Sequence, residues 1–182
     1  MSIGAGRPPP DLQARALRWL AQREHSRVEL RAKLLRSARQ AAARDPGGGS
    51  ADEGARDNGD DDRSDAPVAD VMAIDALLDR LEARGLLSDE RFVQSRLRVR
   101  ATGAGLRRLE AELARHALAL PAADRARLQA SEVQRAAALW RHRFGGVAAD
   151  PKERARQMRF LAGRGFAADV IRRAAAALRA GD

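Results

Sequence analysis

The residues of this chain with the clearest potential for binding chemistry are arginines on the polar sides of predicted helices. A guanidinium group is planar, keeps its charge at neutral pH and forms paired hydrogen bonds with phosphates and carboxylates. In the segment 106–117 the leucines share one side of a helix, which leaves Arg107, Arg108 and Arg115 on the other. Side chains of this type at this spacing favour contact with a polyanion or an acidic surface.

Residue types that support catalysis are scarce. The chain has no cysteine, which removes disulfides, thiol nucleophiles and zinc-finger chemistry, and its histidines (His25, His116 and His142) lack the spacing of metal ligands. Acidic neighbours such as Asp89 and Glu90 are explained by their place in the first turn of a helix. No phosphate-binding loop accompanies them. The sequence therefore predicts a protein that is not an enzyme and has no cofactor.

Charge is divided unevenly along the chain. The net charge is +9, yet the stretch 44–70 holds nine acidic residues against three arginines, so the rest of the chain is strongly basic. Such a density of positive charge is typical of proteins that bind polyanions; a surface that only keeps the protein in solution is the alternative. The acidic stretch has few apolar residues and many glycines, so we predict a disordered insertion over about residues 44–67. We interpret it as a linker; a polyanion mimic that covers the basic surface is the alternative.

Composition and apolar spacing predict an all-α protein. Alanine, leucine and arginine dominate, and aromatic residues make up 3% of the chain, which favours helices over a sheet. Ser26 and Glu29 form a capping box that starts one helix. Asp150, Pro151 and Glu153 suit the first turn of another. We expect about nine short helices.

These helices group into tandem modules of three. We predict a flexible N-terminus over residues 1–10, a first module over 11–86 that contains the acidic insertion, a second over 87–130 and a third over 131–182. Tandem modules usually build an extended surface, so we expect an extended, curved rod that hinges at Leu87 and near Ser131. The apolar stripe of every helix is used by the core, which predicts a monomer.

No part of the sequence is typical of a membrane segment. A run of 18 apolar residues is absent, and the N-terminal residues lack the apolar stretch of a secretory signal. We expect a cytoplasmic protein without membrane contact.

Three phrases of the sequence resemble the RecX family of regulatory proteins. They begin at Arg23 (R-E-H-S-x-x-E-L), at Leu81 (L-x-x-x-G-L-L-S-D-E-R-F) and at Arg164 (R-G-F-x-x-D-x-I-R). The three occur in the family's order, around modules of the right size, and the resemblance covers most of residues 12–180. It implies tandem three-helix repeats, in agreement with the helix count.

The resemblance also implies a partner. RecX proteins bind the filament of the recombinase RecA on single-stranded DNA, along its groove, so we expect this chain to modulate RecA, mainly by inhibiting its recombinase, ATPase and coprotease activities. In this interpretation the contact residues are basic side chains of three helices, namely Arg27, Arg31, Lys33, Arg96, Arg98, Arg100, Arg107, Arg108 and Arg115. For each of them a solvated helix face or an ion pair, such as Arg108 with Glu112, is the alternative.

The chain departs from the family pattern at the acidic insertion and at Ala167, where a serine commonly caps the final helix. The segment 116–130 matches least. Two other functions stay open. An independent DNA-binding protein could use helix-turn-helix-like units, although its helices offer few asparagines or glutamines to read bases. A scaffold for a protein partner alone would not need the basic excess.

Overall fold

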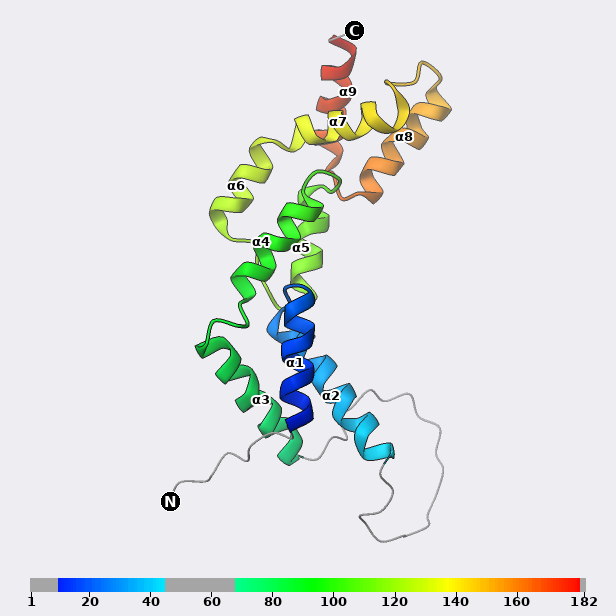
Figure 1. Ribbon diagram of the computed structural model, residues 1–182. Coiled ribbons are helices and arrows are strands. Elements are labelled where there is room, and N and C mark those ends of the chain that lie inside the picture. Colours follow the sequence, from blue (N-terminus) through cyan, green and yellow to red (C-terminus); the bar gives the residue numbers. More distant parts are fainter. Residues whose placement is uncertain (1–9, 45–67, 181–182) are drawn as a thin grey trace. The chain divides into compact units, whose positions relative to one another are not determined.

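The computed structural model describes residues 10–44 and 68–180, and these residues form nine α-helices and no strand (Figure 1). The predicted all-α class and the number of helices are confirmed. The acidic insertion and nearly all of the predicted flexible N-terminus lie outside the described residues. The three modules and the extended, curved rod stay predictions. No helix of the described residues is long and apolar enough to cross a membrane.

The chain divides into two compact units, residues 1–89 (unit 1) and residues 90–182 (unit 2). The described part of unit 1 contains three helices, α1 (Pro10–Gln22), α2 (Arg27–Arg44) and α3 (Val68–Ala83). Helix α2 packs against both α1 and α3. Their apolar stripes meet in a core of Leu12, Ala16, Leu30, Leu34, Ile74, Leu77, Leu78, Leu81 and Leu87.

Unit 2 holds the remaining helices. They are α4 (Asp89–Arg100, which begins at the boundary), α5 (Leu106–Ala114), α6 (Ala122–Ala130), α7 (Glu132–Phe144), α8 (Pro151–Gly163) and α9 (Ala168–Ala180). One core cluster joins α4, α5 and α6, and a second joins α7, α8 and α9. Trp140 is fully buried in the second cluster, and its indole N–H donates to Oε1 of Gln157 at 2.9 Å. Helices α7 and α9 pack against each other and cross in Figure 1.

The helix starts and stops follow the local sequence signals. The backbone N–H of Glu29 donates to Oγ of Ser26 (3.1 Å), and that of Glu153 donates to the Asp150 carboxylate (2.8 Å), so both predicted N-caps are confirmed. Gly85 and Gly165 end α3 and α8 with φ angles of 66° and 89°. In each turn the glycine N–H donates three residues back (2.8 and 2.9 Å) and the next N–H five residues back (2.9 and 3.2 Å). This is the Schellman pattern, in which glycine adopts the left-handed conformation at no steric cost.

A group of polar contacts ties the two core clusters of unit 2 together. The Arg135 guanidinium, on α7, donates to the carbonyls of Ala101 and Ala104 (2.6 Å each) and of Leu128 (3.0 Å). The buried Glu132 carboxylate accepts the first N–H of α5, from Leu106, at 2.8 Å. These bonds from α7 to the segment before α5, within the compact unit of residues 90–182, oppose the flexible hinge that the sequence predicts near Ser131, and the hinge stays a prediction.

A close approach of two backbone segments in unit 2 also lies beside this group. The N–H of Gly105 donates to the carbonyl of Arg164 at 2.9 Å, which brings the segment before α5 against the turn after α8. A Cβ atom on Gly105 would overlap backbone atoms of Gly165 and Phe166, and one on Gly165 would overlap Arg108. Helix α5, which carries Arg107 and Arg108 and is followed directly by Arg115, is thus held in place by α7 and by the α8–α9 turn.

Candidate functional site

The predicted contact residues on α2 are all bound to acidic side chains of unit 1. Arg27 donates to Asp79 (2.7 Å) and Glu82 (2.6 Å) on α3, and its backbone N–H donates to Asp89 (2.8 Å). These pairs are partly exposed, so each contributes little to stability on its own. To bind a partner, the Arg27 guanidinium would have to break its ion pairs with these two carboxylates.

Arg31, one turn further along α2, is bound in the same way. Its Nε and Nη2 atoms donate to the two carboxylate oxygens of Asp75, at 2.7 and 3.0 Å. This hydrogen bond holds the pKa of Asp75 below its ordinary value, despite an opposing effect of burial. The paired geometry that suits Arg31 for a phosphate is therefore already in use within unit 1.

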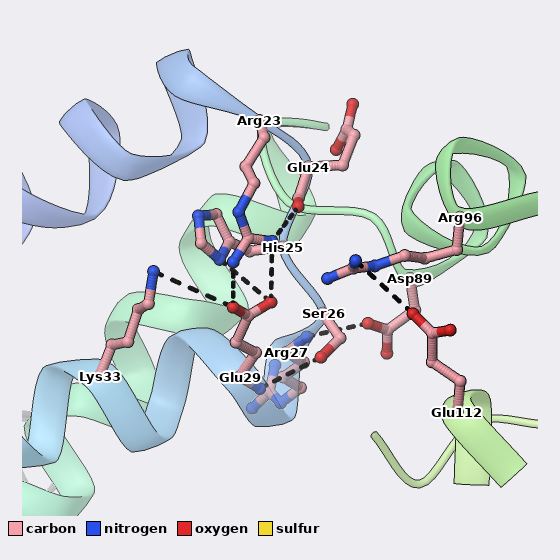
Figure 2. A network of polar contacts seen from close by, with 10 residues as sticks. All are labelled: Arg23, Glu24, His25, Ser26, Arg27, Glu29, Lys33, Asp89, Arg96 and Glu112. Atoms are coloured by element: carbon pink, nitrogen blue, oxygen red, sulfur yellow. Dashed lines mark hydrogen bonds and ion pairs between the residues drawn. The ribbon is translucent and has the colours of Figure 1, made fainter. Parts of the chain in front are cut away.

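Lys33 belongs to a cluster around the start of α2 (Figure 2). The Glu29 carboxylate lies 3.1 Å from Nη1 of Arg23 and 3.9 Å from Nζ of Lys33, and Nδ1 of His25 lies 3.2 Å away, though not aligned for a hydrogen bond. Burial alone would raise the pKa of Glu29, but the hydrogen bond from Arg23 and the surrounding positive charges outweigh it and lower that pKa. Only 1% of the surface of His25 is exposed, and this burial lowers its pKa.

The lowered pKa of His25 predicts that acid destabilises unit 1. Folded His25 binds its proton less readily than in the unfolded chain, so the free energy of unfolding falls as the pH drops below about 6.5. We expect a lower melting temperature at about pH 5.5 than at about pH 7.5, and a smaller difference in His25→Gln. His142→Gln, at an exposed position, is the control and keeps the pH dependence of the parent. An equal pH dependence in His25→Gln and the parent would contradict the assignment.

Arg96 and Arg100, on α4, share one carboxylate. Nη1 of Arg96 lies 3.6 Å from Oε1 of Glu112, and Nε of Arg100 lies 4.0 Å from the same atom. The Arg96 guanidinium also lies over the ring of Phe92, 5.0 Å from its centre. The Arg96–Glu112 pair is drawn in Figure 2. Glu112 thus faces α4, and among the described residues no ion pair joins it to Arg108.

The other four predicted contact residues carry no acidic partner within the described part of the chain; they are Arg98, Arg107, Arg108 and Arg115. All four are exposed, as the helical spacing predicts. Arg108 alone of these makes a side-chain hydrogen bond, from Nη1 to the carbonyl of Gly163 (3.2 Å). The structure therefore separates the nine predicted residues into a paired set in unit 1 and a mostly unpaired set in unit 2.

Three of the unit 2 arginines converge on one surface hollow of about 530 Å³. Its lining consists of Arg100, Arg108, Ala111, Glu112, Arg115, His116 and Gly163. Of the other three predicted residues in unit 2, Arg98 lines a hollow with Arg127 and Arg135, and Arg107 lines another with Arg125 and Arg173, whereas Arg96 lines none of these three hollows. We call the first of these, the one lined by Arg100, Arg108 and Arg115, the arginine hollow.

Sequence reasoning found the arginines of this hollow but not their surroundings. Arg108, Ala111, Glu112 and Arg115 share one side of α5 because they are spaced by three, four and seven residues. Gly163 comes from α8, far along the chain, and no sequence pattern places it beside Arg108. His116 was interpreted only as a residue without metal-ligand spacing, yet its ring packs edge-on against Phe92 at 4.7 Å and lines the hollow.

Comparisons with known proteins agree along the chain. Residues 130–175 match the model of the third three-helix domain of RecX. The chain is 41% identical over 169 residues to the regulatory protein RecX of Ralstonia nicotianae, covering 92% of this chain and 87% of that one. It is 38% identical over 173 residues to the regulatory protein RecX of Leptothrix cholodnii (93% and 90%), and 37% over 170 residues to that of Pseudomonas putida (91% and 89%).

Proposed function

Because the chain belongs to the RecX family of regulatory proteins, we propose that it binds the filament that RecA forms on single-stranded DNA and lies along the filament groove. By doing so it restrains the recombinase, ATPase and coprotease activities of RecA. It acts as a monomer in the cytoplasm and by binding alone, without catalysis or a cofactor. The observation that supports this most directly is the set of exposed arginines in unit 2 that no acidic side chain of the described residues neutralises.

Electrostatics explains how such a surface would act. A nucleoprotein filament presents phosphates and carboxylates, and unneutralised guanidinium groups raise the rate of encounter and then pair with either. Arg98, Arg107, Arg108 and Arg115 can form such pairs without breaking an ion pair within unit 2. Arg27 and Arg31 cannot, since each would first have to leave its carboxylates. We therefore assign the main contact to unit 2.

The test is the DNA-dependent ATPase of RecA on single-stranded DNA, titrated with substoichiometric amounts of this protein. The parent should inhibit, and the variant with Arg98, Arg107, Arg108 and Arg115 changed to alanine should need about tenfold more protein for the same inhibition, or more. Inhibition by the parent should also weaken as salt is raised, because each phosphate contact releases counterions.

A control of equal charge is needed because exposed arginines without an acidic partner also occur in the described part of unit 1. Changing Arg18, Arg36, Arg39 and Arg84 to alanine removes the same charge there and should leave inhibition nearly unchanged. Equal losses in both variants would show that net charge matters rather than the unit 2 surface. No inhibition by the parent, with tight binding to bare duplex DNA, would favour the independent DNA-binding protein instead.

A further inference from the structure

We propose that the arginine hollow is a binding site for the phosphodiester backbone of single-stranded nucleic acid. The inference rests on the proposed function and deepens it, because it assigns DNA rather than protein as the ligand of Arg100, Arg108 and Arg115. The three guanidinium groups come from two helices of the same compact unit and line a single hollow of about 530 Å³.

The backbone geometry keeps the hollow open between its arginines. Arg108 on α5 and Arg115, the C-cap residue of that helix, are seven residues apart, which corresponds to about 10 Å along a helix axis. Ala111 lies between them and has only a methyl group, and a Cβ atom on Gly163 would meet nothing within 4 Å. The Gly163 carbonyl accepts a hydrogen bond from Nη1 of Arg108 (3.2 Å), which holds that guanidinium at the edge of the hollow and leaves its other N–H groups for a ligand.

The charge of the lining favours an anion. Glu112 is the one carboxylate among the lining residues, and it is shared with Arg96, which lies outside the lining, 3.6 Å from it. Arg100 is 4.0 Å from Glu112, at the limit of an ion pair, and half of its side chain is exposed. Arg108 and Arg115 pair with no acidic side chain of the described residues. A phosphate oxygen entering the hollow would therefore find guanidinium donors that are not yet neutralised.

The lining also distinguishes a nucleic acid backbone from an acidic protein surface. The centres of protein–protein interfaces combine arginine with large apolar and aromatic anchors, whereas this lining has, beside its arginines and the ring of His116, no aliphatic side chain larger than alanine and no phenyl or indole ring. Phosphate contacts need only arginines and water. No asparagine or glutamine lines the hollow, so binding there should be independent of base sequence.

The experiment measures direct binding without RecA. Fluorescence anisotropy of a labelled oligonucleotide of about 20 thymidines is recorded with the parent and with Arg100→Ala/Arg108→Ala/Arg115→Ala at several salt concentrations. We expect the triple variant to bind about tenfold more weakly or worse, and the slope of log affinity against log salt to fall by about 2, as loss of three phosphate contacts requires. The control Arg156→Ala/Arg159→Ala/Arg179→Ala removes three exposed charges of unit 2 outside the hollow and should keep most of the affinity and slope.

Each result decides the proposal. The proposal would be overturned if the parent did not bind the oligonucleotide, or if the parent and the triple variant bound it with equal affinity. It would also be overturned if a glutamate polymer of equal charge displaced the labelled oligonucleotide as readily as unlabelled oligonucleotide does. If circular dichroism shows that the triple variant is unfolded, Arg115→Glu, a single exposed change, replaces it; we then expect weaker binding than by the parent and a salt slope smaller by about 0.7, for one lost phosphate contact. The RecA ATPase assay is run in parallel. Inhibition by a parent that does not bind the oligonucleotide would leave the proposed function standing and refute this site alone.

Discussion

Gly105→Ala should destabilise unit 2 by about 3 kcal/mol, which is a large part of the free energy of unfolding of a typical protein. The added methyl group would overlap backbone atoms of Gly165 and Phe166, which cannot rotate away as the end of a flexible side chain could. Any shift that relieves the overlap lengthens the hydrogen bond from the Gly105 N–H to the Arg164 carbonyl, now 2.9 Å. Urea unfolding followed by tryptophan fluorescence measures the effect, because Trp140 is buried in unit 2.

Gly103→Ala is the matched control for this prediction. It lies two residues earlier in the same segment, its φ angle is not positive, and a Cβ atom there would meet nothing within 4 Å. We expect its free energy of unfolding to stay within about 1 kcal/mol of the parent, on either side. If both variants were equally unstable, the cause would be the loss of glycine flexibility in the segment, and the close approach to Gly165 would be refuted as the reason.

Arg135→Ala should cost unit 2 a similar amount, about 3 kcal/mol. The substitution leaves the carbonyls of Ala101, Ala104 and Leu128 without the donor that now lies 2.6 to 3.0 Å away. It also removes the guanidinium from the ring of Phe166, where their separation is 5.9 Å. Thermal unfolding by circular dichroism gives the loss, and Arg135→Lys should recover part of it, since an ammonium group can still donate to one or two of these carbonyls.

Arg154→Ala tests whether the place of the arginine matters. Arg154 also donates to carbonyls, those of Ala148 and Ala149, but these belong to the segment just before its own helix, α8, and not to another core cluster. We expect a loss of about 1 kcal/mol or less. Equal losses from Arg135→Ala and Arg154→Ala would show that Arg135 does not join the two clusters of unit 2.

Local signals in the sequence predicted the helices well because each signal acts within a few residues. Ser26 and Asp150 cap their helices through N–H groups three residues away, and Gly85 ends α3 through bonds that reach five residues back. The contacts that oppose the hinge predicted near Ser131 are of the opposite kind, because they join residues far apart in the sequence. Arg135 bonds to residues 31 and 34 positions away, and no periodicity or motif reports a contact at that distance.

For the candidate site, too, the sequence predicted local features but not contacts between distant residues. Helical spacing placed Arg107, Arg108 and Arg115 on the polar side of α5, and the structure confirms that they are exposed. Whether an arginine meets a carboxylate depends on another helix, so the pairing of Arg31 with Asp75 across 44 residues could not be inferred. For the same reason, the sequence could not predict that Arg100 on α4 lines the same hollow as residues of α5.

The ion pairs between α2 and α3 bear on how this chain can change length during evolution. They fix the two helices to each other through Arg27 and Arg31, so the register of the pair does not depend on the residues that join them along the chain. Doubling the length of a flexible connection adds only about 0.6 kcal/mol to the entropy of closing it. One partly exposed ion pair offsets about that much. The sequence that joins α2 to α3 is therefore expected to differ in length between related proteins at little energetic cost, while the arginine and acidic positions on the two helices stay coupled.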